Sequence, residues 1–128
     1  MSEKKVEKFI YEADCPVRNV LDRIGDKWSI LVICILGECG TLRFNEINSM
    51  IGNISQKMLT VTLKTLEADG LVSRKMYAQV PPKVEYTLTE IGTSLLPSLA
   101  QLTKWASEHM PAIKASREQY YKTAEASV

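Results

Sequence analysis

Residues 54–74, with the sequence ISQKMLTVTLKTLEADGLVSR, decide the fold. Ser55 is a favourable helix N-cap and Gly70 a favourable C-terminal stop, so a helix is predicted from Ser55 to about Asp69. The leucines that recur at helical spacing, and so predict one buried stripe on this helix, are Leu59, Leu63 and Leu66. The opposite face is polar and basic, which leaves it available to a partner.

Downstream of this helix the apolar residues take the spacing of strands. Two extended runs, residues 71–77 and 84–88, are joined by the sequence Ala78-Gln79-Val80-Pro81-Pro82-Lys83. Paired prolines suit the tip of a hairpin and are excluded from a central strand, because proline has no amide hydrogen to donate. The two runs therefore predict a two-stranded β-ribbon.

Upstream, a short helix is predicted over residues 44–50, and a tight turn containing Gly52 joins it to the 55–69 helix. Two helices joined by a short glycine-containing turn are the arrangement of a helix-turn-helix. Residues 41–43 are predicted to form a short strand just before the first of these two helices.

Two more helices are predicted near the N-terminus. Pro16 occupies a first helical position, with Cys15 at the N-cap, and Gly25 ends that helix. Asp26 then caps a helix over residues 27–36 that has no polar face. A helix that is apolar all round is expected at the centre of the core.

The C-terminal part is predicted to be helical. Thr89 caps a long helix that is expected to kink at Pro97, and a further helix is predicted over residues 112–122, after Pro111. The fold class is therefore mainly α with a small β-wing, a winged helix-turn-helix that dimerises through its N- and C-terminal helices. The expected parts are an N-terminal arm at 1–14, a winged domain with a long dimerisation helix at 15–110, and a C-terminal helix and tail at 111–128.

Composition narrows the functional class. The chain has 128 residues, 45% hydrophobic and 24% charged, which is typical of one soluble globular domain. Three cysteines without metal-ligand spacing, and no secretory signal, favour a reducing cytoplasm.

No apolar window approaches the length of a membrane span, so no membrane contact is expected. The sequence lacks a phosphate-binding loop, a metal cluster and a base beside a nucleophile, so we expect no enzyme, no metal and no cofactor.

The proposed binding face is locally basic. Between Ser55 and Lys83 there are five basic residues and two acidic ones, a balance of +3 in a chain whose net charge is +1. Glutamine and lysine suit base edges and phosphates in the major groove, and helix-end amides attract phosphate. The candidate DNA-binding residues are Arg43, Ser55, Gln56, Lys57, Thr60, Val61, Lys64, Arg74, Lys75 and Lys83.

Other interpretations of these residues stay open. Any solvated helix shows polar side chains opposite a leucine stripe, and some winged domains bind only protein. Arg43 is suited to a phosphate or to a structural ion pair with Glu46 or Asp69. Side chains alternate along a ribbon, so only one of Arg74 and Lys75 is expected to face DNA.

Cys15 is the candidate redox-sensing thiol. At a helix N-cap it faces unsatisfied amides and the positive end of the helix dipole, which favour the thiolate. The alternative is a structural cysteine at the dimer interface. Cys34 lies in the apolar helix and is expected to be an inert core thiol, whereas Cys39 is expected in a glycine-flanked loop. Trp28, Trp105 and His109 are most simply interpreted as packing residues.

Several ordered segments resemble the HxlR-type winged-helix transcriptional regulators of bacteria. The segments that carry the resemblance are Ile24-Gly25-Asp26-Lys27-Trp28, Leu42-Arg43-Phe44-Asn45-Glu46-Ile47, residues 54–74, YAQVPPKVEYTLTEIG at 77–92, and Trp105. They cover about residues 15–109. The family's usual pattern has a second glycine where this chain has Asp26, a change that should be harmless because aspartate is a good N-cap.

The resemblance implies a homodimeric, sequence-specific DNA-binding protein, usually a repressor. It places the recognition helix at residues 55–69 and the wing at residues 74–84. Cys15-Pro16-Val17 resembles the family's Cys-Pro signature, whose cysteine senses electrophiles or oxidants in several members. A dimer implies a palindromic operator on double-stranded DNA, with half-sites about 34 Å apart or a multiple of it. The alternatives are a protein-interaction module that does not bind DNA and a regulator controlled by a small ligand.

Overall fold

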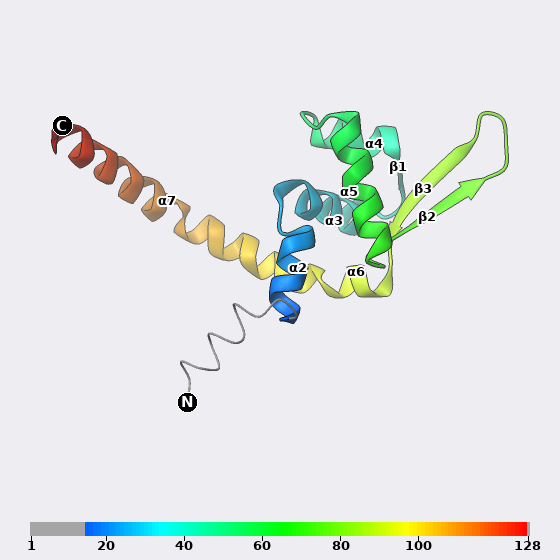
Figure 1. The fold of residues 1–128 in the computed structure, drawn as a ribbon, viewed down its shortest axis with the longest axis horizontal. Helices are drawn as coiled ribbons and strands as arrows, with labels where there is room; N and C mark the ends of the chain where they lie inside the picture. Colours follow the sequence, from blue (N-terminus) through cyan, green and yellow to red (C-terminus); the bar gives the residue numbers. More distant parts are fainter. Residues whose placement is uncertain (1–14, 128) are drawn as a thin grey trace. The chain divides into compact units, whose positions relative to one another are not determined.

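The computed structural model describes residues 15–127, so the expected arm at residues 1–14 lies outside the described part. Figure 1 shows the chain as a set of helices with one small sheet. In chain order the elements are α2 (Pro16–Ile24), α3 (Lys27–Cys39), β1 (Leu42–Arg43), α4 (Phe44–Ile51), α5 (Gln56–Ala68), β2 (Val72–Tyr77), β3 (Lys83–Leu88), α6 (Glu90–Ser94) and α7 (Leu96–Ser127). The structure is mainly helical with a small sheet, as the sequence predicts.

Helix α3 is the central helix of the core. It contacts α4, α5 and β3, and Val32, Ile33 and Leu36 on it are buried. Two details differ from the prediction: the helix continues to Cys39, and Leu31 is 41% exposed. The first difference arises because Gly37 is accommodated within the helix, and the chain reverses only at Gly40, whose φ of 83° suits glycine.

The helix-turn-helix forms as predicted. Helices α4 and α5 are joined by a turn at Gly52, which has a φ of 91° and closes α4 with a hydrogen bond to Asn48. The predicted leucine stripe of α5 is buried, together with Thr62, which the apolar spacing did not identify. Ile47 of α4 completes this part of the core.

The sheet has three antiparallel strands in the order β1-β3-β2. The short predicted strand before α4 pairs with β3, so that Leu42 lies opposite Tyr86 and Arg43 opposite Glu85. The β2–β3 hairpin is the predicted ribbon, and it projects away from α4 and α5 (Figure 1). We call it the wing. Lys83 is the first residue of β3, so the tip comprises residues 78–82.

The C-terminal helices differ from the prediction in two places. The expected single helix after Thr89 is divided into α6 and α7, and the division lies just before Pro97. Proline is tolerated in the first turn of a helix, where its missing amide hydrogen has no partner, so α7 starts at Leu96 instead of kinking at Pro97. Helix α7 also continues through Pro111 to Ser127, so the separate helix predicted at 112–122 is wrong.

The chain divides into two compact units, the first ending at Leu96 and the second beginning at Pro97. Within the first unit, the N-terminus of α6 is hydrogen-bonded to the turn after α5. Thr89 donates its backbone amide to the Leu71 carbonyl over 3.0 Å and its hydroxyl to the Gly70 carbonyl. Among the described helices, none combines the length and the hydrophobicity needed to cross a bilayer.

Candidate nucleic-acid interface

The N-terminus of α5 is capped from within the chain. The Ser55 hydroxyl oxygen accepts a hydrogen bond from the Met58 amide over 3.0 Å, which satisfies one of the helix's unpaired amides. Ser55 is therefore occupied as a cap. Gln56 and Lys57 follow in the first turn, at the positive end of the helix dipole. The side chains of both residues are exposed.

The outward face of α5 carries the other predicted residues. Val61 is 51% exposed, and Lys64 is also exposed. The Thr60 hydroxyl donates to the Gln56 carbonyl over 2.8 Å, which leaves its methyl group and its oxygen lone pairs for a partner. Met58, at 42% exposure, also belongs to this face, although it is not among the predicted DNA-binding residues. Its position between Ser55 and Val61, off the leucine stripe, is the signal that could have identified it.

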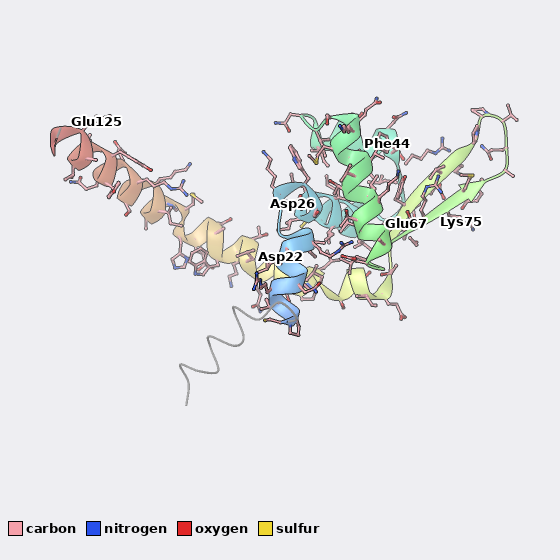
Figure 2. All side chains as sticks on the ribbon, viewed as in Figure 1. Asp22, Asp26, Phe44, Glu67, Lys75 and Glu125 are labelled. Carbon is pink, nitrogen blue, oxygen red and sulfur yellow. The ribbon has the colours of Figure 1, made fainter. Side chains whose placement is uncertain are left out.

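A groove lies between α5 and the wing. It has a volume of about 320 Å³ and brings together Thr60 and Lys64 from α5 with Arg74 from β2. We call this the wing groove. Its other lining residues, not foreseen from the sequence, are Phe44, Leu63, Glu67 and Tyr86. Phe44 lies on α4 and Glu67 on α5, and both are labelled in Figure 2.

The alternation predicted for Arg74 and Lys75 is confirmed by the register of the sheet. Arg74 pairs with Tyr86 and lines the wing groove, whereas Lys75 pairs with Glu85 and lies on the opposite face of the sheet. Lys75, labelled in Figure 2, places its ammonium group 5.0 Å from the centre of the Tyr77 ring. The structure thus separates these two predicted cations onto different faces.

Lys83 is less exposed than a tip residue would be. Its ammonium group is 3.3 Å from a carboxylate oxygen of Glu85 and 4.8 Å from the centre of the Tyr77 ring. Only 28% of the Lys83 side chain is exposed. The cause is the strand pairing, which places Tyr77 directly opposite Lys83.

Arg43 does not form the ion pair with Asp69 that was one of its expected roles. Asp69 is instead bound by Arg23, with 2.7 Å between Arg23 Nε and Asp69 Oδ2. The Asp69 carboxylate raises the pKa of Arg23 through this hydrogen bond. Glu46 contacts Arg43 only through the backbone, because its carboxylate accepts from the Arg43 amide over 2.8 Å and so caps α4.

The three cysteines occupy different environments. Cys15 is the N-cap of α2, as predicted, but it is only 5% exposed and its side chain forms no cap hydrogen bond. Burial, and secondarily the Glu38 carboxylate, raise the pKa of the Cys34 thiol, which agrees with an inert role. Cys39 is exposed, and it is the last residue of α3 instead of part of a loop.

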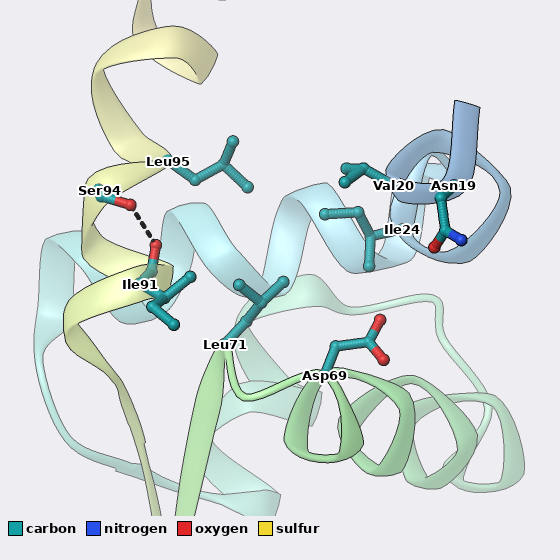
Figure 3. A pocket seen from close by; sticks show the side chains of 8 residues that line it. All are labelled: Asn19, Val20, Ile24, Asp69, Leu71, Ile91, Ser94 and Leu95. Carbon is teal, nitrogen blue, oxygen red and sulfur yellow. Dashed lines mark hydrogen bonds between the residues drawn. The ribbon is translucent and has the colours of Figure 1, made fainter. Parts of the chain in front are cut away.

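An apolar cavity of about 430 Å³ lies between α2, α6 and the turn after α5 (Figure 3). Its apolar walls are Val20, Ile24, Leu71, Ile91 and Leu95. Its polar edge is formed by Asn19, Asp69 and Ser94. The Arg23–Asp69 ion pair joins α2 to the end of α5 beside this cavity. The described residues include no cluster of side chains suited to a metal ion.

Trp105 and His109 pack against each other on α7. Their rings are stacked with 4.6 Å between centroids, and His109 Nδ1 lies 2.9 Å from the Trp105 carbonyl oxygen. Because α7 continues past Pro111, His109 lies within the helix and not at its end. Trp28 is partly buried, with the Lys27 ammonium group 4.4 Å from its ring centre.

Comparison with known proteins points to one family. A family model described as HxlR-like helix-turn-helix matches residues 23–114. The HTH-type transcriptional regulator YybR of Bacillus subtilis is 43% identical over 117 residues, which cover 91% of this chain and 92% of YybR. The regulator YkvN of the same organism is 57% identical over 91 residues, which cover 71% of this chain and 76% of YkvN.

Solved structures agree with this assignment. The redox regulator HypR in its reduced form matches with a TM-score of 0.73 and 43% identity, over 78% of this chain and 98% of HypR. The reduced form of the transcriptional regulator YodB from B. subtilis matches with a TM-score of 0.65 and 40% identity, over 73% of this chain and 92% of YodB. YybR, YkvN and YodB are named as transcriptional regulators and HypR as a redox regulator, and none of the four is named as an enzyme.

Proposed function

Because the chain belongs to the HxlR-like helix-turn-helix family of transcriptional regulators, we propose that it binds a specific operator on double-stranded DNA as a homodimer and represses transcription. The observation that carries the proposal is the wing groove. Lys64 and Arg74 come from α5 and from β2, and they converge with Thr60 on one surface beside the recognition helix. Two cations on separate elements that flank one groove suit a phosphate backbone that runs between helix and wing.

In this proposal α5 enters the major groove with its N-terminal turn first. Gln56 reads a base edge, Lys57 contacts a phosphate or a guanine, and Val61 contacts a thymine methyl group. Met58 adds apolar surface beside Val61, since both side chains are about half exposed. The α5 face supplies sequence discrimination, and the cations of the wing groove fix the position of the helix on the backbone.

A homodimer doubles the contact area, because one recognition helix buries too little surface for tight specific binding. Exposed apolar side chains on α2 and α7 support dimerisation through these helices: Val17, Val20, Leu21, Leu102 and Trp105. Two-fold symmetry of the protein requires a palindromic operator with half-sites about 34 Å apart, or a multiple of that distance.

The experiment is selection of binding sequences from a random duplex pool, followed by footprinting at several salt concentrations. The proposal expects a palindrome with two protected half-sites and an affinity that falls steeply as salt rises. A folded protein that enriches no sequence and shows no salt-dependent binding would instead act as a protein-interaction module.

Redox control through Cys15 is part of this proposal. An N-cap thiol faces the positive end of α2, and the similar protein HypR is named as a redox regulator. Oxidation of Cys15 would move α2, and a small rotation between subunits would change the separation of the two recognition helices. If Cys15→Ser leaves DNA release by peroxide or quinone unchanged, Cys15 is structural and the regulator proposal remains.

Control by a small ligand is the second candidate, and the cavity between α2 and α6 favours it. A volume of about 430 Å³ lies within the range of small-molecule sites, and the walls are mostly apolar. The probe N-phenyl-1-naphthylamine should brighten on binding there. Ser94→Trp, which fills the cavity, should abolish the signal, while Thr93→Trp on the same helix should not. Equal signals from both variants would exclude this site.

A further inference from the structure

Tyr86 of β3 combines a buried ring with a polar group at the wing groove. Only 8% of the residue is exposed, yet it is one of the residues that line the groove. The strand register places Tyr86 directly opposite Arg74, and side chains paired in this way lie on the same face of a sheet. The Tyr86 side chain and the Arg74 guanidinium group therefore share the side of the wing that faces α5.

The hydroxyl group of Tyr86 has no hydrogen-bond partner within residues 15–127. In the same part of the chain, every side-chain oxygen or nitrogen that is sealed from solvent does have such a partner. The Tyr86 oxygen is therefore not sealed, and because the residue lines the wing groove, its hydroxyl lies at the surface of that groove. The fold thus buries the ring and leaves its one polar atom open to a partner from outside.

Packing of the Tyr86 ring does not account for its hydroxyl. A phenylalanine ring would fill the same space, and the hydroxyl of a buried tyrosine usually has a hydrogen-bond partner. The hydroxyl of Tyr77, on the other face of the sheet, shows the contrast, because it donates a hydrogen bond to the Glu85 carboxylate. A structural role therefore explains the ring of Tyr86 but not its oxygen.

The charged groups that line the same groove favour an anion. Lys64 of α5 and Arg74 of β2 contribute two cations, and Glu67 contributes one carboxylate (labelled in Figure 2), which leaves a net charge of +1. Among the described residues, no ion pair joins Glu67 to either cation, so both remain available to a ligand. A neutral hydroxyl donor beside two cations suits the oxygens of a phosphate group.

We propose that Tyr86 contacts DNA, and that its hydroxyl donates a hydrogen bond to the backbone phosphate that Lys64 and Arg74 attract into the wing groove. This inference rests on the proposed function, because it needs the DNA backbone in this groove. The two cations sit on long, flexible side chains and supply attraction. The hydroxyl sits on a ring that the core holds in place, so it fixes where the phosphate rests and thereby the position of the wing on the duplex.

The test compares the full-length wild-type protein with Tyr86→Phe, which removes only the hydroxyl, on the selected operator and on a random-sequence duplex between about 50 and 200 mM salt. Loss of a hydrogen bond to a charged group should weaken binding to both duplexes about tenfold. The salt slope should stay unchanged, because the variant removes no cation and so alters no counterion release. Arg74→Ala, in contrast, should lower the slope by about 1.

Operators with one modified phosphate locate the contact. In each duplex of the series, one phosphate of a half-site is replaced by an uncharged methylphosphonate. At the phosphate that Tyr86 contacts, the modification and Tyr86→Phe should be coupled, so that together they weaken binding less than the product of their separate fold-changes. At phosphates elsewhere in the operator, the two fold-changes should multiply.

Two controls separate this contact from a structural role. Tyr120→Phe on α7 removes a hydroxyl from an exposed ring and should leave both affinities unchanged. Thermal unfolding followed by circular dichroism should give Tyr86→Phe a Tm no lower than that of the wild-type protein, because the hydroxyl has no partner within the described chain. A clearly lower Tm would show that the hydroxyl serves the fold and would overturn the proposal.

The remaining outcomes are also distinguishable. If Tyr86→Phe binds both duplexes as tightly as the wild-type protein, or if no modified phosphate is coupled to it, the phosphate contact is overturned although the protein remains a DNA-binding regulator. Weaker binding to the operator alone would assign the hydroxyl to a base edge and would equally overturn the contact. If the wild-type protein binds neither duplex at low salt, the proposed function itself fails.

Discussion

At the scale of single residues, Asp26 shows how one side chain positions a helix. Its two carboxylate oxygens accept hydrogen bonds from Ser29, one from the amide over 2.9 Å and one from the hydroxyl over 2.8 Å. Ser29 is buried, so these bonds also satisfy a polar group inside the core. The structure confirms that aspartate at this position is a favourable N-cap for α3.

Asp26→Ala should lower the free energy of unfolding by about 1–2 kcal/mol at neutral pH, because it removes the cap of the central helix. Urea unfolding measures this loss. Asp22→Ala is the matched control, since Asp22 is exposed and forms only a 3.8 Å ion pair with Arg18. A control variant as destabilised as Asp26→Ala would contradict the assignment.

The loss of stability caused by Asp26→Ala should depend on pH. Burial acts to raise the pKa of Asp26, but the hydrogen bonds from Ser29, together with weaker ones from the Asp26 and Trp28 backbone, outweigh it and hold the pKa below its ordinary value of 3.8. A lowered pKa stabilises the folded state above 3.8, and this contribution disappears as the pH falls through the pKa of the folded protein. The difference in the free energy of unfolding between the wild-type protein and Asp26→Ala should therefore shrink below pH 3.8 and stay constant above about pH 5.

At the scale of elements, the connection between α6 and the turn after α5 keeps the C-terminal end of the recognition helix in place. Gly92 is buried, and a methyl group built on it would collide with the Leu71 backbone carbonyl. Gly37 in α3 offers a contrast, because a methyl group there would meet only the flexible end of the Leu96 side chain at 2.7 Å.

Gly92→Ala should therefore destabilise the protein by about 3 kcal/mol, the upper end of the usual cost of overpacking, because backbone must move. Gly37→Ala should be nearly neutral, since the gain in helix propensity of about 1 kcal/mol offsets the shift of Leu96. Chemical unfolding measures the free energy of unfolding of both variants and so tests this difference. Similar losses at the two positions would show that α6 is not held as tightly as the contacts indicate.

On α5, Gln56→Ala and Lys57→Ala should have different effects on DNA binding. Loss of a base-reading glutamine should relax discrimination at one operator position by about 1–3 kcal/mol. Loss of a phosphate-contacting lysine should weaken all sequences alike and lower the salt slope by about 1. Competition assays with single-base operator variants separate the two. Identical effects on operator and random DNA would argue against the assignment of this face.

The helices and the wing were predictable because caps, glycine stops and apolar spacing act locally. The length of helix α7 was not predictable from Pro111 alone, because a proline removes only one hydrogen bond of the helix. The alanine-rich segment that follows Pro111 favours a helix and continues it to Ser127. The wing groove depends on the register between β2 and β3, which the two separate strand patterns do not specify.

At the scale of the whole molecule, the proposed dimer combines two surfaces of different chemistry. Net positive charge is concentrated on α5 and the wing, whereas exposed apolar side chains occur on α2 and α7. Leu102→Glu should shift the protein toward monomers in sedimentation velocity and weaken operator binding at least about 100-fold, because both half-sites no longer bind together. Val80→Glu is the control: Val80 is 99% exposed at the wing tip, so the dimer should persist. Dimers that survive Leu102→Glu would exclude this part of α7 from the interface.

The most direct measurement of DNA binding by α5 and the wing is the salt dependence of affinity for a fluorescent operator duplex, read by anisotropy. We expect the logarithm of the affinity to fall linearly with the logarithm of salt, and Lys64→Ala combined with Arg74→Ala to lower the slope by about 2. Lys114→Ala combined with Lys122→Ala, on α7, should leave the slope unchanged. A wild-type affinity independent of salt, or a slope that the wing-groove variant retains in full, would show that α5 and the wing do not hold a phosphate backbone.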